Sequence, residues 1–342
     1  MTGALLVTAP GLHTTVQDLG RFGYQALGVP VAGALDPVAL RLANSLVGNP
    51  QASAALEFFY AGPSFEIAAT SVRMAAANAE IEVLGSSRQV VPPWRSAMFQ
   101  RGDRVRVGAP LAAACGYLAV EGGFDLDPVL GSRSTYSRSA IGGHEGRPLA
   151  PGDSLPLARD AVEPRREVQL GTTPDMAPPE RLRVVLGPQE ALFTDQALEA
   201  LLSEPFRVSK QADRMGLRLD GPKLDHRGGY NIVSDGIVTG AIQVPGSGQA
   251  ILLLADHQTT GGYPKIATMI SADLPAAGRL KPGDPVRFAA VSVEAAEAAA
   301  RRLEKRIADH AADLVPAGRV GSPDTAALYG DNLVSGVVSA VE

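Results

Sequence analysis

The chain repeats four of its own short motifs in the same order, and this repetition constrains its fold more than any other feature. The paired segments are "LLVTAPG" with "VVLGPQ", "QDLGRFGY" with "QADRMGL", "GVPVAG" with "IQVPGSG", and "RGDRVRV" with "PGDPVRF". Each match alone is weak, but four matches in one order predict a duplicated β domain. The expected junction is Ala158–Glu180, a stretch rich in charged residues and proline.

The distribution of glycine and proline supports a β-rich fold. The 342 residues include 37 glycines and 26 prolines between short Val, Ile and Leu runs, which is typical of strands joined by tight turns. Two segments have helical periodicity instead, one following Asp36 and one following Ser292, and both residues are good N-caps. We therefore expect a mainly β protein with domains at residues 1–165 and 180–290, and a C-terminal helix and tail at 291–342.

Composition excludes several classes of protein. The formal net charge of -5 argues against a nucleic-acid groove, which needs clustered lysine and arginine. No apolar stretch is long enough to span a bilayer, and the N-terminus lacks the pattern of a signal peptide, so we expect neither membrane insertion nor export. The single cysteine, Cys115, lies in a strand-like apolar run and fits packing in a reducing cytoplasm. The five histidines show no metal-ligand spacing, so no metal site is expected.

One loop carries more polar chemistry than a turn requires. Between two apolar runs, the segment 256–265 ("DHQTTGGYPK") contains an acid, an imidazole, an amide, two hydroxyls, a phenol and an amine. Similar clusters occur at 13–25, 209–216 and 228–249, each near a Gly-rich turn. A small barrel can bring such loops to one rim, which predicts a polar pocket for a small molecule. The alternative is a network of paired charges that holds the barrel together, with Lys210 and Lys265 as solvated surface lysines.

Several catalytic signatures are missing from the sequence. It has no G-x-S-x-G elbow, no Walker A motif and no G-x-G-x-x-G that opens a helix after a strand. From the residues alone, the reaction stays open.

The polar clusters also carry a family pattern. The segments "TTVQDLGRFGYQALGVPVAGALDPVALRLANSLVGN", "GYLAVEGGFDLDPVLGSRST", "SKQADRMGLRLDGPKL", "SDGIVTGAIQVPGSGQAILLLADHQTTGGYPKIATMISADL" and "LKPGDPVRF" follow one another in order. Together they resemble the biotin-dependent carboxyltransferase-type family that includes allophanate hydrolase subunit 2, over about residues 4–288. The resemblance implies two tandem cyclophilin-like β-barrel domains, which agrees with the repeat.

The resemblance also implies three alternative functions. A stand-alone member is expected to act as the C subunit of an ATP-dependent 5-oxoprolinase, which hydrolyses 5-oxo-L-proline to L-glutamate. Its partners would be proteins like the A and B subunits of that enzyme, and the sequence does not identify which of the three proteins binds ATP. A second function is carboxyl transfer from a separate biotin carrier to urea or a similar amide. A third is regulatory binding that antagonises the inhibitor of a kinase.

The site residues are taken from the family motifs that this chain matches. The candidate catalytic residues are Lys210, Asp256 and Thr260, with Asp213 as another possible base. The candidate substrate-binding residues are Gln211, Arg214, Gln243, Gln258, Thr259, Gly261, Gly262 and Tyr263. Cations suit a carboxylate or phosphate, and paired amides suit a lactam or amide group. Gln17, Asp18 and Arg21 are expected to support this pocket from the first repeat.

Overall fold

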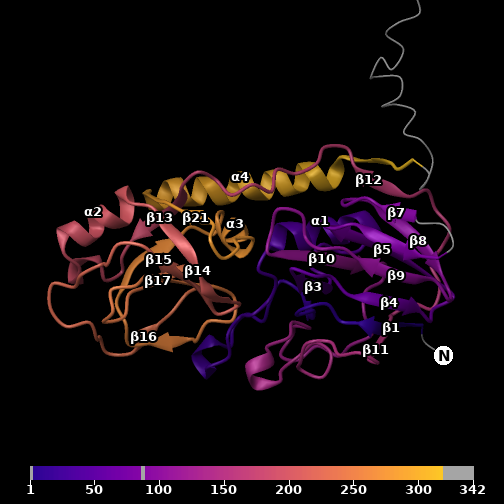
Figure 1. Cartoon of the computed structure of the whole chain (residues 1–342), viewed down its shortest axis with the longest axis horizontal. Coiled ribbons are helices and arrows are strands. Elements are labelled where there is room, and N and C mark those ends of the chain that lie inside the picture. The colour runs from indigo at the N-terminus through magenta and orange to yellow at the C-terminus, as the bar shows by residue number, and fades with distance from the viewer. Residues whose placement is uncertain (1–2, 86–88, 319–342) are drawn as a thin grey trace, which may run out of the picture.

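The computed structural model describes residues 3–85 and 89–318 and contains two β-rich bodies that lie side by side. A long helix, α4 (Val293–Ala312), runs along both bodies (Figure 1). Residues 319–342 of the predicted tail lie outside the described residues. The protein is mainly β with tandem barrels, as the sequence predicts. The exact domain limits stay a prediction.

The first body is a flattened barrel made of two antiparallel sheets that pack face to face around one core. One sheet has the order β11 (Ser154–Pro156), β1 (Ala4–Ala9), β4 (Ser64–Ile67), β9 (Arg104–Val107), β6 (Ile81–Leu84) and β7 (Gln89–Val91). The other has the order β2 (Thr15–Gln17), β3 (Ala55–Phe59), β10 (Cys115–Val120), β5 (Ser71–Ala77) and β8 (Ser96–Gln100). Their facing side chains, among them Phe58, Phe65 and Leu118, form one hydrophobic core.

Helix α1 (Pro37–Val47) covers the outer face of the five-stranded sheet. Asp36 caps it by accepting hydrogen bonds from Val38 N and Ala39 N at 3.0 and 3.1 Å, and Gly48 ends it in the left-handed conformation. Its apolar side packs against a second cluster of side chains that includes Tyr117. All six residues of β10 are therefore buried, because core lies on one face of the strand and α1 on the other.

The second body is one eight-stranded sheet that nearly closes on itself. Its order is β21 (Pro285–Val286), β14 (Phe206–Asp213), β15 (Gly216–Asp220), β18 (Ile251–Leu253), β17 (Ala241–Gln243), β20 (Lys265–Met269), β13 (Leu182–Leu186) and β22 (Phe288–Ala290). The two edge strands, β21 and β22, are separated in the chain only by Arg287. A single stretch of chain thus pairs with both ends of the sheet, and the barrel surrounds its own core.

The repeat detected in the sequence is visible in the turns that enter β9 and β21. In the first body, Asp103 accepts a hydrogen bond from Gln100 N at 2.8 Å, and Gly102 N donates to Ile67 O. In the second body, Asp284 accepts from Lys281 N at 2.8 Å, and Gly283 N donates to Val208 O. The two Gly-Asp motifs therefore form the same hydrogen-bonded turn, as a duplication predicts.

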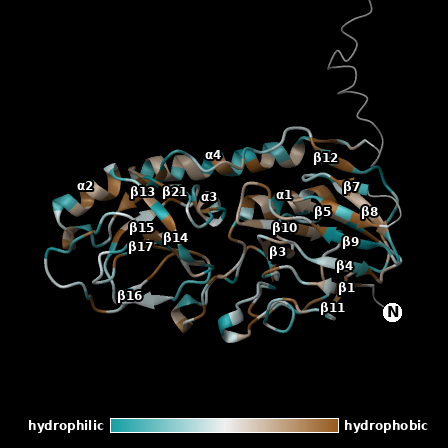
Figure 2. Cartoon of the chain, viewed as in Figure 1, coloured by the Kyte–Doolittle hydropathy of each residue, from teal (hydrophilic) through white to brown (hydrophobic). Residues whose placement is uncertain are grey.

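Smaller elements complete the structure. They are the helices α2 (Asp195–Ser203) and α3 (Leu274–Gly278), the 3₁₀ turns η1 (Gln25–Leu27), η2 (Ser137–Ser139) and η3 (Glu190–Leu192), and the strand pairs β12 (Val168–Leu170) with β23 (Leu314–Pro316) and β16 (Asp235–Gly236) with β19 (Thr260–Gly261). Figure 2 shows polar and apolar residues alternating along α4, and Ile307 is buried against α1. The Arg41–Glu304 ion pair, at 2.8 Å, also links α4 to α1.

Candidate functional site

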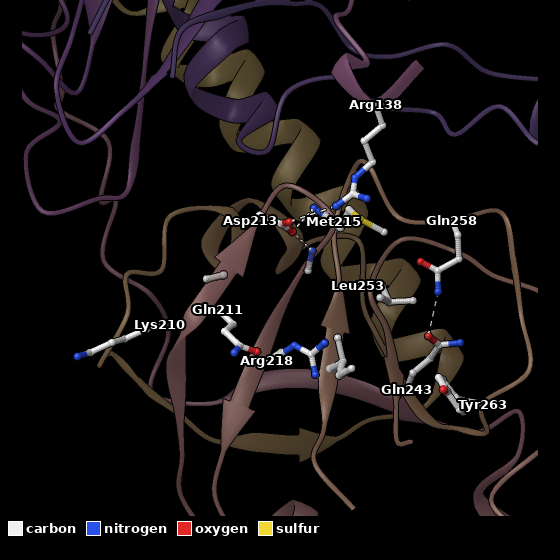
Figure 3. A pocket seen from close by; sticks show the side chains of 13 residues that line it. Arg138, Lys210, Gln211, Asp213, Met215, Arg218, Gln243, Leu253, Gln258 and Tyr263 are labelled. Carbon is white, nitrogen blue, oxygen red and sulfur yellow. Dashed lines mark hydrogen bonds and ion pairs between the residues drawn. The ribbon is translucent and has the colours of Figure 1, made fainter. Parts of the chain in front are cut away.

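The principal candidate site is a cavity of about 400 Å³ on the outer face of the second barrel (Figure 3). The alternation of side chains in β15 decides which residues of that strand face this cavity. Leu217 and Leu219 point into the barrel core, so Gly216 and Arg218 occupy the opposite face. Five predicted site residues line the cavity: Lys210, Gln211, Gln243, Gln258 and Tyr263. Arg138, Asp213, Met215 and Arg218 line it as well.

A pair of glutamines forms one wall of the cavity. Gln258 Nε2 donates to Gln243 Oε1 at 3.3 Å. Gln243 is only 2% exposed, and its Nε2 atom has no hydrogen-bond partner among the residues that the structure describes. A buried amide donor without a partner is uncommon in proteins, and here it lines a cavity that can hold a ligand.

The short β16–β19 ribbon lies beside this pair. At Gly261 a Cβ atom would come within 2.9 Å of Gln243 Nε2 and 2.8 Å of Ile237, so a larger residue would displace the amide. Lys265 anchors the ribbon by donating from Nζ to Asp235 at 2.7 Å and to Gly236 O at 3.2 Å. Lys265 is 2% exposed. The interpretation of Lys265 as a solvated surface lysine is therefore wrong, because its ammonium group is needed to hold this ribbon.

Two predicted site residues, Arg214 and Asp256, do not line this cavity. They form a buried ion pair in which both Asp256 carboxylate oxygens accept from Arg214, at 2.9 and 3.0 Å. Arg214 also donates to Gly33 O at 2.7 Å and to the Glu57 carboxylate, both in the first body. Burial lowers the pKa of Arg214, but the charges of Asp256 and Glu57 outweigh it and raise this pKa above the usual range. The group therefore stays charged and joins the two barrels.

The three predicted supporting residues lie in the first body and organise a loop. Asp18 accepts hydrogen bonds from the hydroxyls of Ser132 and Ser134, each at 2.6 Å. The buried Arg21 donates to Val129 O at 3.1 Å and to Ser134 O at 2.8 Å. Gln17 Nε2 donates to Thr135 O at 3.1 Å. These bonds fix the segment that leads into η2.

The fixed segment brings Arg138 to the cavity. Arg138 lies in η2, and its guanidinium is 3.6 Å from the Asp213 carboxylate of the second barrel. The three supporting residues therefore affect the cavity indirectly, through the loop that carries Arg138. Arg138 gave no signal in the sequence, because only the folded arrangement brings η2 and the end of β14 together.

The remaining predicted residues lie in or beside the ribbon rather than in the cavity lining. Thr259 O accepts from Ile237 N at 3.0 Å, and Thr260 and Gly261 form β19. Gly262 O accepts from Ile232 N at 2.9 Å. Among the lining residues, Figure 3 shows Lys210 extending away from the others. Arg218 was missed, although its position in the alternating segment "GLRLD" places it on the cavity face.

The described residues lack both a metal-binding cluster and a membrane-spanning helix. They contain no group of three His, Cys, Asp or Glu side chains arranged to hold a metal ion. They also contain no helix with the length and apolarity needed to cross a bilayer.

Comparison with known proteins assigns the family. A family model described as "Carboxyltransferase domain, subdomain A and B" matches residues 27–290. The chain belongs to this carboxyltransferase family. It is 38% identical to the C subunit of 5-oxoprolinase from Escherichia coli (strain K12) over 297 residues, which cover 85% of this chain and 93% of that protein.

Members of the carboxyltransferase family with other names are also similar to this chain. It is 31% identical to urea amidolyase of Saccharomyces cerevisiae over 85% of its own length and 17% of that protein. The crystal structure of the K. lactis urea amidolyase superposes with a TM-score of 0.80 at 29% identity, covering 90% of this chain and 20% of that one. The fold is thus shared by proteins that are named for different activities.

Proposed function

We propose that this chain is the C subunit of an ATP-dependent 5-oxoprolinase, which hydrolyses 5-oxo-L-proline to L-glutamate. The observation that carries the proposal is the 38% identity with the E. coli protein over 93% of that protein's length. The similarity therefore extends over nearly the whole length of that protein. The urea amidolyases, in contrast, contain this region as a small part of a much longer chain.

The chemistry of the cavity is consistent with this role. The substrate is a small lactam that carries a carboxylate. Amide groups such as those of Gln243 and Gln258 can orient the lactam, and cationic side chains can bind the carboxylate. In the overall reaction, water adds its oxygen to the lactam carbonyl carbon, the ring C–N bond breaks and the nitrogen is released as an amine. ATP drives this step by transferring its γ-phosphoryl group to the carbonyl oxygen, which releases ADP. A second water then cleaves the resulting acyl phosphate to the carboxylate and free phosphate.

Two aspartates are candidates for the base that activates the attacking water, and the ion pairs favour Asp213 over Asp256. Both oxygens of Asp256 accept hydrogen bonds from Arg214, so neither is free to take a proton. Asp213 lines the cavity, and its side chain is 60% exposed. Its Oδ1 accepts from Met215 N at 2.8 Å, while its Oδ2 is 3.6 Å from Arg138 and remains accessible to water.

The proposal includes partner proteins. The name of the E. coli relative identifies it as one subunit of an enzyme, so we propose that this chain assembles with proteins like the A and B subunits of 5-oxoprolinase. We also propose that the complete active site forms only in that assembly, in the cytoplasm. We propose that the assembled complex binds ATP, and we assign no residue of this chain to ATP binding.

The test is a reconstitution. The chain is purified alone and with the products of candidate genes for the A-like and B-like partners, and ATP-dependent release of glutamate from 5-oxo-L-proline is measured. We expect turnover by the mixture and none by this chain alone. A mixture that co-elutes as a complex but releases no glutamate would contradict the proposal.

Carboxyl transfer is the second candidate function, and the structural similarity to urea amidolyase favours it. That reaction needs a biotin carrier, and none of the six methionines in this chain precedes a lysine, so the usual biotinylated Met-Lys pair is missing. The carrier would have to be another protein. Transfer of labelled carboxyl from a carboxybiotin carrier to urea, in the presence of this chain, would establish this function instead.

A further inference from the structure

Three residues on the floor of the cavity lie in one row across adjacent strands. Arg218 on β15 is directly opposite Ile251 on β18, and Ile251 is directly opposite Gln243 on β17. Directly opposed residues of an antiparallel sheet point to the same face. The row therefore presents a guanidinium, an apolar side chain and an amide in sequence, and all three line the cavity.

The spacing of this row suits one small ring. Opposed Cα atoms in an antiparallel sheet are about 4.5–5.5 Å apart, so two steps from Arg218 to Gln243 span about 10 Å. Both polar side chains line the same cavity, at the two ends of this span. Ile251 and Leu253 supply an apolar surface beneath that space. Figure 3 shows Arg218 between Gln211 and the Gln243–Gln258 pair.

The two ends of the row offer donors that the described part of the protein leaves unused. Gln243 Nε2 is buried beside Gly261 and has no partner there, while the Oε1 atom of the same amide accepts from Gln258. The guanidinium of Arg218 forms no hydrogen bond or ion pair with any other described residue, whereas Arg138 is within ion-pair distance of Asp213. Asp213 is the single acidic residue in the described lining, against the cations Arg138 and Arg218, with Lys210 extending away from them. The cavity therefore has an excess of donors and positive charge.

We propose that the Arg218–Ile251–Gln243 row selects small lactams or amides that carry a carboxylate. Arg218 binds the carboxylate, Ile251 contacts the saturated ring carbons, and Gln243 Nε2 donates to the amide carbonyl oxygen. This inference rests on the proposed function, which it deepens by assigning substrate selection to residues of this chain. It also predicts poor binding of urea, which has a carbonyl but no carboxylate to satisfy Arg218.

The test compares two probes that differ in one group. Binding of 5-oxo-L-proline and of 2-pyrrolidone, the same lactam ring without the carboxylate, is measured by calorimetry or ligand-observed NMR. The full chain is used alone and in complex with its partner proteins. Hydrogen bonds to charged groups contribute enough that the wild-type chain should prefer 5-oxo-L-proline by roughly tenfold to a hundredfold. Arg218→Ala should abolish this preference and leave the affinity for 2-pyrrolidone unchanged.

A second variant tests the other end of the row. Gln243→Met keeps a similar volume and removes the donor, so it should weaken binding of both probes by the same factor. Arg104→Ala is the matched control, because Arg104 is a strand arginine of the first body with a side chain that is 68% exposed. It should change neither affinity. The melting temperature of each variant is measured to confirm that it folds.

The outcomes separate this inference from the proposed function. If the reconstituted complex releases no glutamate but the carboxylate preference exists and depends on Arg218, the function fails and the inference stands. If glutamate is released and Arg218→Ala keeps the wild-type KM and the wild-type preference, the inference fails and the function stands. Equal binding of the two probes by wild type, or binding of neither by the chain or the complex, overturns the inference.

Discussion

Replacing Asp256 with alanine should destabilise the protein, because this carboxylate neutralises an arginine buried between the two barrels. The Arg214 and Asp256 side chains are 8% and 7% exposed, and the Glu57 side chain is fully buried. Arg214 donates two hydrogen bonds to Asp256, one to Glu57 and one to Gly33 O. Without Asp256, two donors of a buried guanidinium lose their acceptors.

The expected size of the effect follows from these two bonds. Each buried donor left without an acceptor costs about 1–3 kcal/mol, which gives roughly 2–6 kcal/mol for the pair. Removal of one partner from a buried ion pair typically costs about 3–5 kcal/mol, within the same range. We therefore expect the free energy of unfolding of Asp256→Ala to fall by about 3–5 kcal/mol. Because Arg214 also contacts the first body, the loss should loosen the contact between the barrels.

The assay is urea unfolding followed by fluorescence or circular dichroism, with Glu297→Ala as the control. Glu297 pairs with Arg301 at 3.6 Å on the surface of α4, where the two side chains are 63% and 71% exposed. Loss of this exposed pair should change stability by less than about 1 kcal/mol. If Asp256→Ala and Asp256→Asn keep wild-type stability while the assembled enzyme loses turnover, the structural argument is refuted and Asp256 acts in catalysis.

Three further predictions concern other residues. Lys210→Ala and Thr260→Val should keep wild-type melting temperatures. If these residues act in catalysis, the kcat of the assembled enzyme should fall roughly a hundredfold or more. Unchanged turnover would remove them from the site. Burial lowers the pKa of His257, so the imidazole takes up a proton at a higher pH in the unfolded chain than in the folded protein. Stability should therefore fall as pH drops below about 6.5, and His257→Gln should reduce that slope, measured by urea unfolding at about pH 7.5 and about pH 5.5. Burial also raises the pKa of the Cys115 thiol well above its usual range, so iodoacetamide should label the denatured protein and not the native one.

Local sequence signals predicted the elements that depend on neighbouring residues. Asp36 and Ser292 cap their helices as expected, because a cap needs only the first turn that follows it. The Gly-Asp turns at Asp103 and Asp284 were detectable for the same reason. The ion pair of Glu297 with Arg301 also follows from helical spacing alone.

Features that depend on distant parts of the chain were not predictable in this way. Lys265 is buried because Asp235, 30 residues away, folds over it, and the sequence around Lys265 gives no sign of that contact. Arg138 reaches the cavity only because the two barrels lie side by side. The acidic and basic residues of the motif at 211–216 were expected to share one pocket, yet they point in different directions once the hairpin forms.

The hairpin of β14 and β15 explains how that motif serves both the barrel contact and the cavity. Asp213 and Gly216 pair across a two-residue turn, and this turn places Arg214 between the barrels, where it binds Glu57 and Asp256. The strands behind the turn carry Gln211 and Arg218 to the cavity. A substitution at the turn should therefore change stability and the cavity together, since both depend on the same hairpin. A substitution at Arg218, beyond the turn and on the exposed face, should change ligand binding while stability stays the same, which is why Arg218 can test the cavity separately from the fold.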